Sequence, residues 1–242
     1  WQQDSASRLA GKLRLPLLIA LVVGAGVWIM QPEVGLVAAA GIAGGMWVIV
    51  GSLFYVGTVM TRKSRYKLPA SVLAMTLAHV GLGVFLLGVS LTSSISSEKH
   101  LRMVAGDHHQ MAGYNFEFVG TRVVRGPNST AKEGAFIITR DDREVTRLYP
   151  QKREYAQGGN TMTEAAIDPG FTRDLYVSLG EPLDDTGNAW AVRVYHKPFI
   201  RWIWLGSIFM MAGGLLAATN KRYRRKMTAK KAAQAKTEGA TA

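Results

Sequence analysis

The sequence of 242 residues contains no cysteine. This absence excludes disulfide bonds, thiolate nucleophiles and cysteine metal sites. The chain also lacks a Gly-Xaa-Ser-Xaa-Gly element, a phosphate-binding loop and a paired-histidine metal motif. Those short motifs mark many hydrolases, nucleotide-binding proteins and zinc enzymes. Because these motifs are absent, the sequence does not indicate any of these common enzyme classes.

Charged residues are almost absent from four apolar runs, at about 15–30, 34–60, 68–92 and 199–219. A helix needs about 20 apolar residues, at about 1.5 Å each, to cross a bilayer. The first run reaches this length if Leu13 is included and the head group of Arg14 extends towards water. The sequence therefore predicts a membrane protein with four transmembrane α-helices.

The polar segment between the third and fourth runs, residues 93–198, has the patterns of β-strands. Apolar and polar side chains alternate in the first half of 114–124 and in 190–195, and Asp141 and Asp142 form a hairpin-like turn between two further runs. A short helix or turn is predicted at 162–167. Frequent Gly and Pro between short strands favour an antiparallel β domain, a small sandwich or barrel, between helices three and four.

The distribution of charge predicts the orientation in the membrane. The net charge is +12, but residues 93–198 hold 13 Lys and Arg against 14 Asp and Glu. The excess lies in the connector 1–14, in the loop 61–67 and in the tail 220–242, which are alternate sides of a four-helix serpentine. The positive-inside rule then places both termini in the cytoplasm and the β domain outside it. The basic flanks indicate contact with anionic lipid rather than nucleic acid, and the tail is expected to be disordered.

His79 is the only ionisable residue of the third run and lies near its middle. A titratable ring at that depth is costly unless a partner satisfies it, so it is a candidate functional residue. Three interpretations remain open: a hydrogen bond between helices, proton transfer, or ligation of a metal or haem. Gly83, one turn on, is expected to leave room for a flat porphyrin, and Thr76 is a candidate acceptor for the second ring nitrogen. The other histidines are interpreted as solvated surface residues: His100, His108, His109 and His196.

A second group of candidates is a cluster of charged residues in the β segment. Paired carboxylates can perform acid–base chemistry, but the spacing here matches no hydrolase arrangement. Salt bridges that organise a loop are the favoured interpretation, and a partner-binding surface is the functional alternative. No catalytic residue is assigned. The cluster consists of Glu164, Asp168, Arg173 and Asp174.

Several motifs together resemble one family. They are LAHVGLGVFLLGVSLTSS at 77–94, EKHLRMVAGD at 98–107, VRGPN at 124–128, MTEAAIDPGFTRDLYVSLGEP at 162–182 and AVRVYHKPFIRWIWLG at 191–206. In this order they resemble the C-terminal part of CcmF, the bacterial haem lyase of cytochrome c maturation. The resemblance extends over about 68–223.

The resemblance implies that His79 is one of two membrane histidines that hold a structural haem b. It implies a multi-pass protein of the bacterial inner membrane, with the β domain in the periplasm. The implied activity is covalent attachment of haem to the cysteines of apocytochrome c, with the haem chaperone, apocytochrome c and thiol-handling assembly subunits as partners. The family's other haem ligands and its tryptophan-rich segment have no counterpart here. The chain begins at Trp1, and we expect it to be the C-terminal part of a lyase or a processed piece. It is expected to be inactive without the N-terminal part of the same lyase.

Two other functions are alternatives to haem attachment. The chain is alternatively a non-catalytic membrane scaffold of a cytochrome-assembly complex, whose β domain only binds partners. A transporter subunit is disfavoured because charged residues are lacking within the spans.

Overall fold

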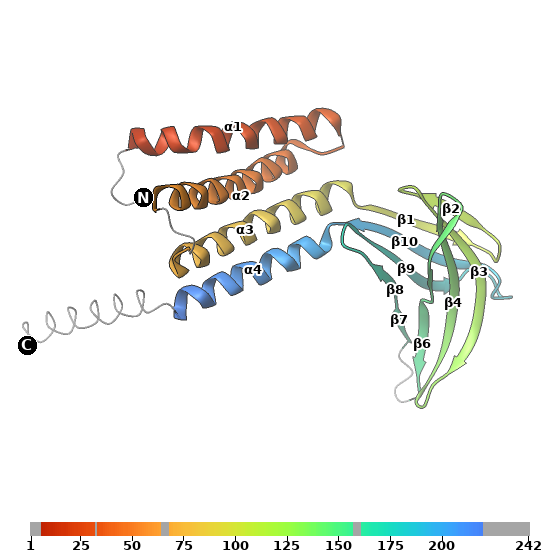
Figure 1. The fold of residues 1–242 in the computed structure, drawn as a ribbon. Helices are drawn as coiled ribbons and strands as arrows, with labels where there is room; N and C mark the ends of the chain where they lie inside the picture. Colours follow the sequence, from red (N-terminus) through yellow and green to blue (C-terminus); the bar gives the residue numbers. More distant parts are fainter. Residues whose placement is uncertain (1–5, 32, 64–67, 157–160, 220–242) are drawn as a thin grey trace, which may run out of the picture. The chain divides into compact units, whose positions relative to one another are not determined.

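The computed structural model describes residues 6–31, 33–63, 68–156 and 161–219 (Figure 1). These residues form two compact units. The helical unit combines the chain up to Ser94 with the chain from Trp202, and the β unit is Ile95–Arg201. The β unit is therefore an insertion between the third and fourth helices, as the sequence predicts.

Four helices lie in the described ranges, and each is long and apolar enough to cross a membrane. The first begins within the predicted connector 1–14, because Arg and Lys are good helix formers. The predicted disordered tail 220–242 and most of the basic loop lie outside the described residues. The helices are α1 (Ala6–Met30), α2 (Leu36–Lys63), α3 (Ala70–Ile95) and α4 (Ile200–Thr219).

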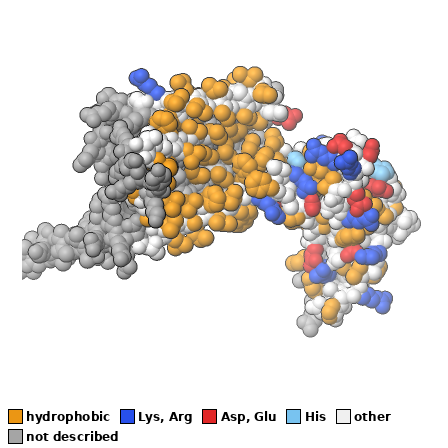
Figure 2. Space-filling model, in the orientation of Figure 1, with side chains coloured by type: hydrophobic (Ala, Val, Ile, Leu, Met, Phe, Trp, Pro, Cys, Tyr) orange, Lys and Arg blue, Asp and Glu red, His pale blue; other side chains and the backbone are white. Residues whose placement is uncertain are grey.

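The surface of the helical unit is apolar. Figure 2 shows hydrophobic side chains over most of its visible face, whereas Lys, Arg, Asp and Glu are spread over the β unit. Val22 and Val37 are 71% and 89% exposed. A water-soluble domain rarely exposes so large a continuous apolar surface, so this surface is suited to lipid.

Small residues bring neighbouring helices close together. A Cβ atom at Gly24 of α1 would lie 2.8 Å from Ala43 Cβ of α2, and one at Gly45 of α2 would lie 2.8 Å from the carbonyl oxygen of Gly83 in α3. Helices in lipid gain stability from such close packing, since the apolar solvent supplies little drive for association. Glycine is therefore required where these backbones meet.

In the described part of the β unit, ten strands form two antiparallel sheets, which makes the unit a sandwich. Sheet A has the order β1-β10-β9-β8, and sheet B has the order β2-β3-β4-β6-β7 with β5 also paired to β4. The strands are β1 (Ser97–Met103), β2 (His108–Met111), β3 (Tyr114–Arg125), β4 (Ser129–Arg140), β5 (Arg143–Leu148), β6 (Gln151–Tyr155), β7 (Thr161–Glu164), β8 (Ala166–Pro169), β9 (Arg173–Pro182) and β10 (Trp190–Pro198).

Alternate residues of the strands fill the core between the sheets. In sheet B the rings of Phe118 and Phe136 stack with centroids 4.9 Å apart. In sheet A, Leu175, Val177 and Leu179 of β9 are fully buried. This alternation is the period of two that the sequence shows.

The β unit forms one of the two turns predicted from the sequence and does not form the other. Asp141 and Asp142 take φ values of 51° and 57°, which suit a tight hairpin of the predicted kind. The helix or turn predicted at 162–167 is wrong, because this segment forms parts of β7 and β8. β7 pairs with β6 in sheet B and β8 pairs with β9 in sheet A, so backbone pairing within each sheet overrides the weak local helix signal.

Candidate functional site

His79 lies on α3 and is the only ionisable residue of that helix. Its side chain is exposed on the helical unit rather than packed between helices. The ring therefore has access to a ligand at the surface that the apolar side chains present to lipid.

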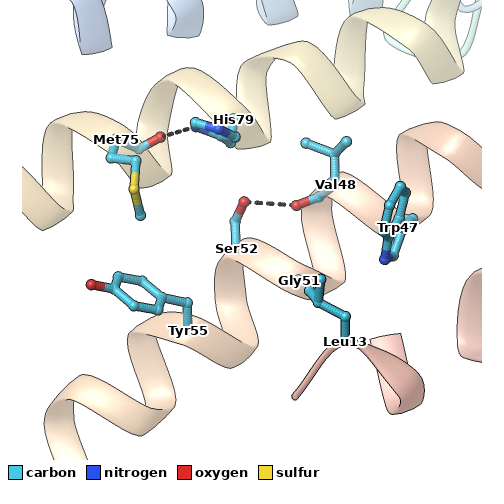
Figure 3. A pocket seen from close by; sticks show the side chains of 8 residues that line it. All are labelled: Leu13, Trp47, Val48, Gly51, Ser52, Tyr55, Met75 and His79. Carbon is cyan, nitrogen blue, oxygen red and sulfur yellow. Dashed lines mark hydrogen bonds between the residues drawn. The ribbon is translucent and has the colours of Figure 1, made fainter. Parts of the chain in front are cut away.

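One hydrogen bond fixes the tautomer of a neutral His79 ring. Nδ1 lies 2.8 Å from the carbonyl oxygen of Met75, one turn earlier (Figure 3). A carbonyl oxygen only accepts, so Nδ1 carries the hydrogen, and Nε2 of the neutral ring keeps its lone pair. Histidines that bind metal ions are commonly held in this way, with the second nitrogen donating to a backbone carbonyl.

The acceptor differs from the candidate named from the sequence. Thr76 does not bond to His79; the backbone of Met75 does. The Thr76 hydroxyl is itself buried and has no hydrogen-bond partner in the described part of the chain. The i−4 carbonyl was available to the ring because its position follows from helix geometry alone.

A pocket of about 200 Å³ lies beside His79 (Figure 3). Three helices line it, with α1 contributing one residue, α2 five and α3 two. Its walls are mainly apolar. The lining residues are Leu13, Trp47, Val48, Gly51, Ser52, Tyr55, Met75 and His79.

Besides His79 of α3, the polar side chains of the pocket come from α2. The Ser52 hydroxyl donates to the carbonyl oxygen of Val48 at 2.7 Å, so its donor is already used. Figure 3 shows the Tyr55 ring extending from α2 towards the side of the pocket where Met75 lies. Residues 48, 51, 52 and 55 share one face of α2 because three and four residues make one helical turn. The spacing predicts the shared face from the sequence, whereas the pocket also depends on how α1 and α3 pack against that face.

Two glycines near the site differ in role. A Cβ at Gly51 would have nothing within 4 Å, so the absence of a side chain at this position leaves space in the pocket. A Cβ at Gly83 would lie 2.4 Å from Ile49 Cγ1 and 2.7 Å from the carbonyl oxygen of Gly45. The expectation that Gly83 leaves room for a porphyrin is therefore wrong, because α2 fills that space. Gly51 is the residue that keeps space open.

The β unit holds a second polar cluster, centred on Tyr114. Its phenol oxygen accepts hydrogen bonds from Arg140 Nη1 and Arg173 Nε, each at 3.2 Å. Burial raises the pKa of the Tyr114 phenol, but the hydrogen bonds from Arg173 and Arg140 outweigh it and hold the pKa below its ordinary value. The two arginines thus stabilise negative charge on the phenol oxygen.

His196 belongs to this cluster, and its interpretation as a solvated surface residue is wrong. Its ring lies 6.0 Å from that of Tyr114, and its Nδ1 is buried without a partner in the described residues. Burial and then the charges of Arg173 and Arg140 lower its pKa. The ring points inward because it shares a face with Val192 and Val194.

The four charged candidates of the β segment lie in two places. Asp168, Arg173 and Asp174 meet at the turn between β8 and β9, where Arg173 Nη1 donates to Asp168 Oδ2 at 2.5 Å. Asp174 Oδ1 accepts the backbone N–H of Gly170 at 3.1 Å. Glu164 lies on β7 of the other sheet and pairs with Arg153 at 2.8 Å. Each charge therefore has a local structural contact.

The remaining histidines show no metal centre. His100 and His108 are exposed, and His100 Nε2 pairs with Glu98 at 2.8 Å. In the ranges that the structure covers, no three His, Asp or Glu side chains come close enough to hold a metal ion. His79 is thus the strongest candidate ligand of the described residues.

The sandwich and the sequence around the site match known proteins. The family described as "CcmF C-terminal beta-sandwich" matches residues 94–198. Cytochrome c-type biogenesis protein CcmF of Pseudomonas fluorescens is 42% identical over 216 residues, which cover 82% of this chain and 32% of that protein. The chain belongs to the CcmF family.

Further relatives agree with this CcmF assignment. CcmF of Escherichia coli is 36% identical over 234 residues, covering 96% of this chain and 36% of that protein. A solved structure titled "Cytochrome c Heme Lyase CcmF" has a TM-score of 0.70 at 14% identity and covers 85% of this chain and 34% of that chain. At that identity the likeness shows the fold alone. The chain spans about a third of the length of the CcmF proteins that it matches.

Proposed function

We propose that this chain forms the C-terminal part of a haem lyase and holds a b-type haem in the membrane through Nε2 of His79. One observation carries the proposal: the Met75 carbonyl oxygen accepts a hydrogen bond from Nδ1–H, so the lone pair of a neutral ring lies on Nε2, where it can bind iron. The CcmF family membership and the central position of His79 in an apolar span support it.

The pocket fits one side of a haem. Its volume of about 200 Å³ is below the range of roughly 300–1,000 Å³ that encloses a small organic ligand. The apolar lining and the free imidazole nitrogen suit one axial position and part of a macrocycle. A second ligand and the remaining wall would come from the N-terminal part of the lyase, since the spans of this chain hold no other histidine.

The residues of the pocket would have separate tasks. His79 would fix the iron, and the Met75 carbonyl would hold the imidazole in one tautomer. Leu13, Trp47 and Val48 would exclude water, which affects the reduction potential of a bound haem. When bound, haem supplies a one-electron redox centre, which the family resemblance links to reduction of the haem that is joined to apocytochrome c.

The proposal extends to orientation and partners. The charge distribution supports a β unit in the periplasm and termini in the cytoplasm of a bacterial inner membrane. Partners would be the N-terminal part of the lyase, the haem chaperone, apocytochrome c and the thiol-handling assembly subunits. Glu164, Asp168, Arg173 and Asp174 would contribute to their docking surface, and the chain alone would not catalyse attachment.

The test is the absorption spectrum of the reduced full-length parent protein with and without His79→Ala. We expect the variant to lose a b-type signal from a haem with two histidine ligands. Leu73→Ala is the matched control, because Leu73 is 47% exposed on the same helix and does not line the pocket. An unchanged haem content in His79→Ala would reject the proposal.

A scaffold function is the second candidate, favoured by the fact that the Nδ1 hydrogen bond partly satisfies the ring without iron. Under this alternative, His79→Ala leaves cytochrome c maturation intact, whereas substitutions on the β unit abolish it. Measuring cytochrome c production in cells that carry each variant separates the two functions.

A further inference from the structure

The turn between β8 and β9 displays an aromatic side chain to solvent. Phe171 is 62% exposed at this turn, which consists of residues 170–172. A single exposed apolar residue is ordinary and needs no explanation by itself. Its place in the chain is what distinguishes Phe171.

The turn is hydrogen-bonded to the start of α4. The backbone N–H of Phe199 donates to the carbonyl oxygen of Thr172 at 3.1 Å, and the next residue, Ile200, is the first of α4. Consecutive Cα atoms lie about 3.8 Å apart, so Thr172 lies within a few ångströms of the point where the helix begins. All of these residues belong to the β unit.

The turn is also held rigidly. The Gly170 N–H donates to the carbonyl oxygen of Arg173 at 2.8 Å, and Arg173 in turn pairs with Asp168. Phe199 takes a φ of 57°, a left-handed conformation that a residue with a large side chain adopts only where its surroundings fix it. The position of Phe171 relative to the first residue of α4 is therefore fixed by several contacts.

The length of α4 fixes the depth of its first residue. The helix has 20 residues, or about 30 Å, which equals the thickness of the hydrocarbon core of a bilayer. In the sequence, Lys221 and Arg222 follow the apolar residues of this helix, so the run fills the hydrocarbon core when Ile200 lies near its boundary. Arg201 agrees with a position at the boundary, because a charged head group there reaches water. Trp204, 68% exposed, is of the residue type that concentrates at membrane interfaces.

We propose that Phe171 inserts into the head-group region of the bilayer leaflet that faces the β unit, so that the β8–β9 turn anchors this unit to lipid. The head groups add about 5–8 Å on each side of the hydrocarbon core, which is within reach of a phenylalanine at this turn. The anchor is independent of haem and depends only on α4 crossing the membrane.

The absence of cysteine allows a direct test. The full chain in lipid nanodiscs receives one cysteine, as Phe171→Cys or Val123→Cys, and an environment-sensitive fluorophore. Val123 is the matched control, because it is also 62% exposed but lies near the opposite end of β3 from Tyr114. We expect lipids with a nitroxide at the head group to quench the label at 171 several-fold more than the label at 123.

A second variant keeps the phenylalanine. With the label at Thr172→Cys, the added substitution Phe171→Asp is expected to reduce quenching by the nitroxide lipids. Equal quenching at 171 and 123 would overturn the proposal, as would protection of 171 from aqueous iodide without quenching by lipid, which would indicate a protein contact. Unchanged quenching after Phe171→Asp would also overturn it.

Discussion

At the scale of single residues, the hydrogen bond between His79 and Met75 decides what the site can do. The bond leaves Nε2 as an acceptor, and the ring is exposed beside a pocket rather than packed between helices. A ring that served only to join two helices would direct its nitrogen atoms to a neighbouring span. The geometry therefore favours an external ligand.

Filling the pocket should exclude haem without disturbing the fold. Gly51→Leu places a side chain in the pocket, where a Cβ atom meets nothing within 4 Å. We expect the haem content of the full-length parent to fall severalfold while its thermal stability is retained. Gly44→Leu is the control, since Gly44 is also open but does not line the pocket. Equal haem content in the two variants would contradict the site.

His196 should make the stability of the β unit depend on pH. Its folded pKa lies below the ordinary value of about 6.5, so the unfolded chain binds a proton first as the pH falls. Stability is fully present above that value and is lost as the pH falls through it towards the lower folded pKa. Thermal unfolding between about pH 7 and pH 5 measures this loss.

The matched variants isolate this histidine. His196→Phe keeps a ring against Tyr114 and should flatten the pH dependence, whereas His108→Phe at an exposed position should leave it as in the parent. A steep loss of stability that persists in His196→Phe would show that other groups cause it.

Part of the environment of His79 and His196 was predictable from the sequence. The isolated His79 in an apolar run identified the ligand candidate, because a lone titratable group in lipid needs a reason. The alternation of residues 190, 192, 194 and 196 also indicates that His196 points inward, but the sequence interpretation placed it at the surface. The choice of Met75 as acceptor depends on the rotamer of His79, which a sequence pattern does not encode.

At the scale of elements, glycine contacts hold α3 and α4 together. A Cβ at Gly206 would lie 2.5 Å from the backbone nitrogen of Phe85 and 2.6 Å from the carbonyl oxygen of Gly81. Backbone atoms cannot move aside as a flexible side chain can, so any larger residue separates the helices. These contacts position α3, the helix that carries His79.

Gly206→Ala should therefore destabilise the helical unit by about 1–3 kcal/mol. Gly214→Ala is the control on the same helix, because a Cβ there meets nothing within 4 Å. Alanine at 214 should be neutral or raise stability by up to about 1 kcal/mol, since it is the better helix former. Thermal unfolding in detergent compares the variants, and equal melting temperatures would refute the packing role.

The strands were predicted unevenly. Residues 114–124 alternate over their first half and 190–195 alternate throughout, and these segments form β3 and β10. Residues 162–167 lack such alternation, and they become strands through pairing with β6 and β9, which lie elsewhere in the sequence. A pairing partner distant in the chain leaves no local pattern in the sequence. The local signal at 162–167 therefore favours a helix or turn, although these residues form strands.

At the scale of the whole molecule, the sequence predicts which side of the membrane each segment faces. The basic residues lie in the connector, the 61–67 loop and the tail, and the β unit is close to neutral. If all four helices cross the membrane, we expect the basic segments on one side and the β unit on the other.

Labelling of single cysteines tests this orientation. In intact cells, we expect a membrane-impermeant thiol reagent to label Val123→Cys, whereas Arg65→Cys should react only after the membrane is disrupted. The parent chain, which has no cysteine, provides the blank. Labelling of both positions from the same side would contradict the predicted topology.

The most direct test of the central claim replaces the axial ligand itself. In the full-length parent, His79→Met should raise the reduction potential of the haem and change its reduced spectrum, because a thioether ligand favours ferrous iron. Leu73→Met on the same helix should change neither. A haem in His79→Met with the potential and spectrum of the parent would contradict ligation by His79.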